Sequence, residues 1–177
     1  MPTTFLEGLL SGLTHPALGL DHLAFILVLG VVAALIPAGI PLIAVFIATA
    51  AIGTLVHAVN FDFPLSEQLV ALSVLVAGLL IALGLGARQL IWLPVAGVAG
   101  LLHGYAFGEE ILGADGAVIA AYIVGVVIVC SVIALGVMQI ASKVLALSDA
   151  RSRSLRVAGA LISILGIVLL AQLIRNV

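Results

Sequence analysis

The sequence predicts an all-α integral membrane protein, a bundle of about six transmembrane helices. Hydrophobic residues make up 64% of the 177 residues and charged residues only 8%, whereas soluble proteins carry about 25% charged residues. The mean hydropathy is +1.45. The apolar segments are continuous and rich in Leu, Ala, Val and Gly, unlike the short alternating strands of a membrane barrel. These observations indicate apolar helices packed side by side in a lipid bilayer.

Glycine, proline and charged residues divide the chain into segments close to the length of about 20 residues that a membrane span requires. The expected spans are, approximately, residues 17–36, 40–59, 66–86, 90–109, 115–141 and 155–175. Little chain remains outside them, so we expect residues 1–177 to form a single transmembrane domain. The lone cysteine, Cys130, lies inside the fifth span, where we expect it to pack, and it has no partner for an intramolecular disulfide.

The first span is expected to be kinked or broken. Pro16 lacks a backbone donor and Gly19 tolerates unusual dihedral angles, so both interrupt a regular helix. The apolar stretch 5–13 before them fits either a half-helix or an outer extension of this span. Gly8 and Gly12 are four residues apart in that stretch, a spacing that lets a neighbouring helix approach closely.

The later spans end at polar or charged positions. The second ends before a polar segment around Asp62, and the third ends at the turn before Arg88. The fourth reaches the carboxylates Glu109 and Glu110, and the fifth begins beside Asp115. The sixth fills the last apolar stretch of the chain.

Most Lys and Arg residues lie in two of the connections. Arg88 lies between spans three and four, and Lys143, Arg151, Arg153 and Arg156 lie between spans five and six. With six spans these two connections share one face of the membrane. Because Lys and Arg favour cytoplasmic loops, we expect this face inside and both termini outside.

The opposite face is acidic. Its carboxylates are Glu7, Asp62, Glu67, Glu109, Glu110 and Asp115, against a single Arg175. Such a face attracts cations, although loop carboxylates also serve simply to keep a surface hydrated. The segment 1–4 lacks the positive region of a secretory signal. Either this short tail is translocated unaided, or a signal peptide has been removed. The net charge of −2 and the absence of a basic stripe give no indication of a nucleic-acid partner.

A first group of metal-ligating residues occurs where the first span is expected to break. His15, Asp21 and His22 lie in the run His-Pro-Ala-Leu-Gly-Leu-Asp-His. On a continuous helix the two histidines would stand about 10 Å apart along the axis, too far for one ion. A break at Pro16 and Gly19 would remove this obstacle. Asp21 is suited either to ligate an ion directly or to orient a histidine ring by accepting its second N–H.

A second group follows near the outer end of the fourth span. His103 and Glu110 repeat the seven-residue spacing, with Gly104 and Gly108 between them. The first and fourth spans reach the same face, so we expect the two groups to meet at similar depth. Ionisable residues inside a membrane are costly and mark functional sites. Imidazole and carboxylate ligands suit Ni²⁺, Co²⁺, Zn²⁺ or Cu²⁺ better than Mg²⁺ or Ca²⁺.

Two further residues are candidate ligands. His57 lies near the outer end of the second span. It would be either a ligand on the access path or an interfacial histidine bonded to backbone or water. Glu109 is an alternative to Glu110, because adjacent residues on a helix point about 100° apart. The candidate metal site therefore comprises His15, Asp21, His22, His57, His103, Glu109 and Glu110.

The two groups resemble the signatures of the HupE/UreJ family of nickel permeases. The first signature, His-Pro-x-x-Gly-x-Asp-His, is matched in full by His15, Pro16, Gly19, Asp21 and His22. The second, Phe-His-Gly-x-Ala-x-Gly-x-Glu, is matched by His103, Gly104, Ala106, Gly108 and Glu110, with Leu102 in place of the phenylalanine. That departure concerns packing more than ligation.

The resemblance implies a six-helix carrier for Ni²⁺, with Co²⁺ as the second choice, in a bacterial inner membrane. Such a carrier supplies metal for hydrogenase or urease maturation, so its maturation proteins would be indirect partners. No permanently bound cofactor is implied, and a homo-oligomer is compatible with the family. Many family members carry a cleavable signal, which agrees with an outside N-terminus.

Other function classes use the same residues. An intramembrane zinc-dependent hydrolase would hold Zn²⁺ on His15, His22 and His103 and activate water with Asp21 or Glu110. A membrane anchor for a redox complex would use histidine pairs to ligate haem. No nucleotide-binding loop of the Gly-x-x-x-x-Gly-Lys-Ser/Thr kind occurs. For a permease we therefore expect facilitated transport or coupling to an ion gradient.

Overall fold

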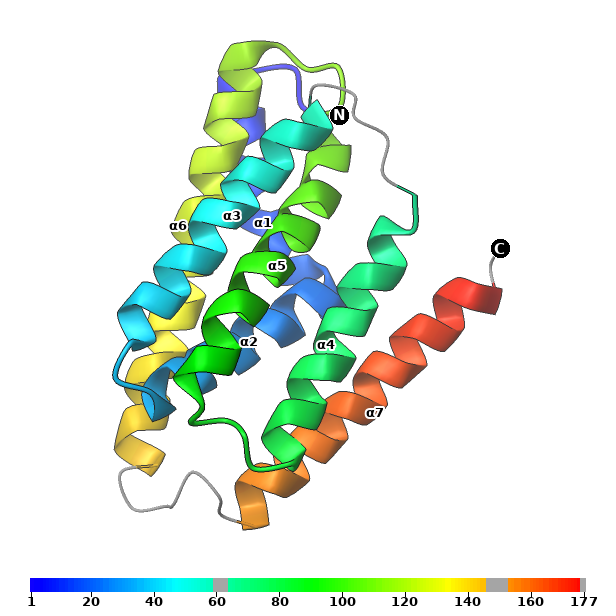
Figure 1. Cartoon of the computed structure of the whole chain (residues 1–177). Coiled ribbons are helices and arrows are strands. Elements are labelled where there is room, and N and C mark those ends of the chain that lie inside the picture. The colour runs from blue at the N-terminus through cyan, green and yellow to red at the C-terminus, as the bar shows by residue number, and fades with distance from the viewer. Residues whose placement is uncertain (59–63, 146–152, 176–177) are drawn as a thin grey trace.

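The computed structural model of the chain describes residues 1–58, 64–145 and 153–175, and these residues form helices without any strand (Figure 1). The helices are α1 (Phe5–Leu18), α2 (Leu20–Leu35), α3 (Gly39–Ala58), α4 (Ser66–Ala82), α5 (Gln89–Gly108), α6 (Gly116–Leu145) and α7 (Arg153–Arg175), with a short 3₁₀ turn, η1 (Glu109–Ile111), after α5. The predicted all-α membrane bundle is confirmed.

The helices follow the expected spans closely, with one shorter than expected. Helices α3, α5, α6 and α7 are each long and apolar enough to cross a membrane, and α1 with α2 forms one bent span. Helix α4 is apolar but has only 17 residues. It ends at Ala82, short of the expected residue 86, because the chain turns at Gly84, whose φ of 77° favours glycine. A total of six crossings therefore depends on counting α4 as a span.

The predicted break in the first span is confirmed. Helices α1 and α2 meet at an angle of 77° around Gly19. Gly19 has an extended backbone with φ −72° and ψ 113°, which any residue can adopt. The need for glycine is spatial, because an added Cβ would lie 2.6 Å from Cδ2 of His22. The sequence suggested that Gly19 was needed for unusual dihedral angles. The structure shows instead that it leaves room for the side chain of His22.

Small residues bring the helices together in pairs. Helix α1 packs on α6, and a Cβ added at Gly8 would lie 2.7 Å from the Val118 carbonyl oxygen. Helix α5 packs on α3, where Gly104 lies against the Ala50 backbone. Close backbone approach through small residues is a common way for membrane helices to associate. The glycine spacings noted in the sequence therefore serve packing.

The charged residues separate to the two ends of the bundle. The turn between α4 and α5, which carries Arg88, lies at the same end as the last turn of α6 and the first turn of α7, at the bottom of Figure 1. We call this the basic end. The start of α1, the end of α3 and the turn between α5 and α6 lie at the other end, which we call the acidic end. It carries Glu7, Glu67, Glu109, Glu110 and Asp115.

Candidate metal centre

The break between α1 and α2 brings two histidines together. His15 lies in the last turn of α1 and His22 in the first turn of α2. Their ring centroids are 5.7 Å apart, compared with the axial separation of about 10 Å on an unbroken helix. The bend therefore removes the obstacle that the seven-residue spacing posed.

His22 contacts His103 from α5 directly. The two Nδ1 atoms are 2.8 Å apart, and the two residues are only 6% and 0% exposed. On its other side, Nε2 of His103 lies 2.9 Å from the hydroxyl oxygen of Ser73 in α4. The Ser73 hydroxyl lies 2.6 Å from the Val70 carbonyl oxygen, to which it donates. Three helices thus meet at one continuous line of polar atoms.

This line of contacts fixes which nitrogens donate. A serine hydroxyl has one proton, and here it goes to the Val70 carbonyl, so Nε2–H of His103 donates to the Ser73 oxygen. A neutral His103 then accepts at Nδ1 from Nδ1–H of His22. The lone pair of a neutral His22 is consequently on Nε2, which lies 3.9 Å from Oδ1 of Asp21.

Two carboxylates lie beside the histidines. Asp21 accepts a hydrogen bond of 2.8 Å from the backbone N–H of His22, which holds its side chain against the helix break. Glu110, in η1, lies 4.0 Å from Nδ1 of His15 and accepts a hydrogen bond of 3.4 Å from the hydroxyl of Ser11. Both carboxylates are therefore near the imidazoles, at distances longer than a hydrogen bond.

Two cavities are lined in part by His15. One, of 330 Å³, is lined by His15, Asp21, His22, Glu67 and Glu109 together with apolar side chains. The other, of 370 Å³, is lined by Ser11, Thr14, His15, Leu18, Gly19 and Glu110. Glu109 and Glu110, adjacent in η1, line different cavities, and His15 lines both. They were expected to be alternatives for one position.

Aromatic side chains pack against the histidine rings. Phe107 is fully buried, and its ring lies 5.6 Å from that of His15 and 4.5 Å from that of His22. Phe25 and Phe46 stack at 5.5 Å, and the Phe25 ring lies 4.8 Å from the ring of His103. The imidazoles are therefore held in place by large apolar rings.

His57 lies apart from the other three histidines. From the last turn of α3, its Nδ1 lies 2.8 Å from the carbonyl oxygen of Tyr105, and the two rings, tilted by 33°, have centroids 4.2 Å apart. Near this carbonyl, the N–H of Glu109 donates to the Ala106 carbonyl at the end of α5. Of the two roles considered for His57, the structure therefore shows the histidine bonded to the backbone. Its neighbour Asp62 lies outside the described residues.

The seven candidate ligands do not form one coordination shell. Across residues 1–58, 64–145 and 153–175, no group of three or more His, Cys, Asp or Glu side chains is arranged to hold an ion. The tight contact is the His22 and His103 pair, with His15, Asp21 and Glu110 around it. Sequence reasoning missed Ser73. A hydroxyl in the middle of an apolar helix is a signal that could have indicated it.

The fold and this cluster define the class of protein: a multi-pass helical membrane protein with a buried histidine cluster near one end. The chain belongs to the HupE/UreJ family, since the sequence profile described as HupE / UreJ protein matches residues 2–169. It is 28% identical over 166 residues to Protein HupE of Rhizobium leguminosarum bv. viciae, covering 93% of this chain and 85% of that protein. No solved structure matches it. Family membership makes it a metal-related accessory membrane protein.

Proposed function

We propose that the chain is a permease for a divalent transition-metal ion, with Ni²⁺ as its substrate and Co²⁺ as the closest competitor. The observation that carries the proposal is the 2.8 Å contact between Nδ1 of His22 and Nδ1 of His103. Membership in the HupE/UreJ family supports the same class. The permease would supply metal to the proteins that mature hydrogenase or urease.

The 2.8 Å separation of the two nitrogens is that of a hydrogen bond between the rings. Two nitrogens bound to one ion at about 2 Å also lie about 3 Å apart, so a small movement of the rings would admit an ion. Imidazole and carboxylate ligands suit Ni²⁺, Co²⁺, Zn²⁺ and Cu²⁺, and the choice of Ni²⁺ rests on membership in the HupE/UreJ family.

The ion would replace the proton between the two rings. Nδ1 of His103 already presents its lone pair, while His22 must shift its proton from Nδ1 to Nε2. Nε2 lies 3.9 Å from Oδ1 of Asp21, which is placed to accept that proton's hydrogen bond after a small movement. Carboxylates commonly hold the second N–H of a metal-bound histidine in this way. Asp21 therefore orients His22 in the proposed mechanism, and His15 and Glu110 complete the shell when the helices move.

Access is from the acidic end. Glu67 and Glu109 line the same cavity as His15 and His22, so a cation meets carboxylates before imidazoles. The rings of Phe25 and Phe46 pack against that of His103 and leave no polar path onward there, so release needs a rearrangement of the helices. With no nucleotide-binding loop in the sequence, that rearrangement would be driven by the ion's own gradient or a coupled one.

The test is uptake into sealed vesicles that contain the reconstituted protein and a metal-sensitive dye. We expect Ni²⁺ to enter faster than Co²⁺, Zn²⁺ to be slower than both, and empty vesicles to show no uptake. Tight Ni²⁺ or Zn²⁺ binding without uptake, in correctly inserted protein, would contradict a permease. It would favour the hydrolase that could be built on the same histidines.

Replacing Glu67 by glutamine is expected to slow Ni²⁺ uptake by about two- to fivefold at low salt and by less at physiological salt. The reason is that Glu67 lines the access cavity and concentrates cations there, an effect that salt screens. Asp115→Asn is the matched control, because Asp115 is exposed at the same end and lines neither cavity. Equal slowing in the two variants would show that only the net charge of this end matters.

Acid is expected to weaken Ni²⁺ binding. The bound form needs unprotonated nitrogens on His22 and His103, so protons compete with the ion, and affinity falls as pH decreases. Calorimetric binding of Ni²⁺ to the purified protein at neutral pH and near about pH 5.5 measures this. Affinity that is constant or higher in acid would mean that carboxylates alone hold the ion.

A further inference from the structure

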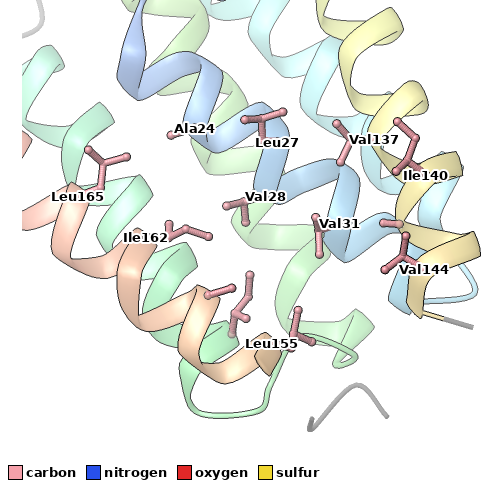
Figure 2. Close-up of a pocket in the computed structure, with 13 residues that line it drawn as sticks. Ala24, Leu27, Val28, Val31, Val137, Ile140, Val144, Leu155, Ile162 and Leu165 are labelled. Carbon is pink, nitrogen blue, oxygen red and sulfur yellow. The ribbon is translucent and has the colours of Figure 1, made fainter. Parts of the chain in front are cut away.

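An apolar groove runs along the side of the bundle between α6 and α7, with α2 as its floor (Figure 2). Its volume is 550 Å³ and every lining side chain is apolar. Val28 and Val31 come from α2, Val137 and Val144 from α6, and Leu155 and Ile162 from α7. The groove therefore offers no ligand to an ion, and it is separate from the histidine cluster.

The packing of α7 creates this groove. Helix α7 lies on α4 at the edge of the bundle, with Gly159 against the backbone of Ala82 and Gly166 against that of Leu75. It hardly touches α2 and is the least buried of the long helices, with 17% of its spanning segment buried. Helices α6 and α7, although consecutive in the described chain, are thus held apart over α2 (Figure 1).

The groove faces the surroundings of the bundle. Ile140 and Val144 line it and are 66% and 65% exposed. In a membrane these surroundings are hydrocarbon. A wholly apolar space does not hold water, and a void would cost its walls their dispersion contacts. The acyl chain of a lipid would fill the groove and provide these contacts.

The basic end of the groove carries cations. Lys143 is exposed and directly precedes Val144, and Arg153 is exposed and two residues before Leu155. Neither forms an ion pair with a carboxylate in the part of the chain that the structure describes. Basic residues between membrane helices commonly bind anionic lipid head groups. We propose that this groove binds an anionic phospholipid, with one acyl chain along α2 and the phosphate near Lys143 and Arg153.

The test is native mass spectrometry of the full chain with an equal mixture of phosphatidylglycerol and phosphatidylcholine. We expect the parent to retain phosphatidylglycerol over phosphatidylcholine by about fivefold or more. Ala158→Phe fills the groove from α7 and should remove most bound lipid. Ala160→Phe makes the same change on the exposed side of α7, outside the groove, and should bind lipid like the parent. Lys143→Gln with Arg153→Gln should bring the two lipids to parity.

Three results would overturn the proposal. Equal retention of the two lipids by the parent would exclude recognition of the head group. Unchanged lipid binding by Ala158→Phe would place the lipid elsewhere on the surface. A dimer that forms without lipid and is lost in Ala158→Phe would show that a second copy of the chain covers the groove.

A second, independent inference concerns Ser73. Its hydroxyl donates to Val70 and accepts from Nε2–H of His103, at 2.6 and 2.9 Å. We infer that Ser73 is a positioning residue that keeps the proton of His103 on Nε2 and so leaves Nδ1 as the metal-binding nitrogen. The inference rests on the proposed function, in which His103 is a ligand. Partners of this kind typically change metal affinity about 10–100-fold.

Nitrogen NMR of histidine-labelled, metal-free protein tests this directly. We expect His103 to be protonated at Nε2 in the parent and in Ser73→Thr, which keeps the hydroxyl. In Ser73→Ala we expect the other tautomer to become populated and Ni²⁺ affinity to fall about 10–100-fold. An unchanged tautomer in Ser73→Ala would overturn the inference. A changed tautomer with unchanged Ni²⁺ affinity would instead contradict His103 as a ligand, and so the proposed function.

Discussion

Replacing His22 by alanine is expected to reduce Ni²⁺ affinity by more than about a hundredfold, since even residues that only orient ligands contribute about 10–100-fold. His22 is the residue that meets both groups of candidate ligands: its Nδ1 contacts His103 at 2.8 Å, and its ring lies 5.7 Å from that of His15. Without it, His15 and His103 have no imidazole between them. Calorimetric Ni²⁺ binding and uptake into vesicles measure the loss.

His57→Asn is the matched control for His22→Ala. His57 lies near the same end of the bundle, and its Nδ1 lies 2.8 Å from the Tyr105 carbonyl oxygen. An asparagine amide can donate from nearly the same position, so folding should be preserved. We expect this variant to bind Ni²⁺ like the parent. If His57→Asn lost as much affinity as His22→Ala, the ion would be bound nearer to α3, and the His22 and His103 pair would not be its centre.

Replacing Gly104 by valine is expected to give the largest loss of stability, at least about 3 kcal/mol. An added Cβ at Gly104 would overlap the backbone of Ala50, and a helix backbone cannot give way as a flexible side chain does. The same glycine accepts a hydrogen bond of 2.9 Å from Thr54, which would be pulled apart when α3 and α5 separate. Unfolding of the purified protein in nanodiscs, followed by temperature, measures the change.

Gly136→Val provides the comparison for Gly104→Val. Gly136 lies in α6, and nothing lies within 4 Å of a Cβ added there. The same substitution should therefore change stability by less than about 1 kcal/mol, in either direction. Similar losses in both variants would mean that valine is poorly tolerated in these helices generally, and that the contact between α3 and α5 is not special.

Much of the fold could be predicted because it depends on local features. The length of each apolar segment predicts a helix, and the residues that interrupt the segments predict where the helices begin and end. Pro16 and Gly19 predict a break. The 77° angle at that break could not be predicted, because it depends on how α1 rests on α6 and how close His22 comes to Gly19. The pairing of α4 with α7 likewise results from tertiary contacts.

The candidate site was partly predictable for a similar reason. Histidines and carboxylates are conspicuous in an apolar chain, so His15, His22 and His103 were evident as candidates. The direct contact between His22 and His103 depends on two side-chain rotamers and on three helices meeting, and no spacing in the sequence encodes it. Glu109 and Glu110 line different cavities, and these cavities are formed by side chains of several helices that no local pattern brings together.

X-ray absorption at the nickel edge tests the central claim most directly, because it reports the ligands of the ion itself. For the Ni²⁺-loaded parent we predict imidazole nitrogens at about 2 Å, with the imidazole signal reduced in both His22→Ala and His103→Ala and unchanged in His57→Asn. A spectrum with only oxygen ligands in the parent, or one that none of these substitutions alters, would contradict a metal site centred on the His22 and His103 pair.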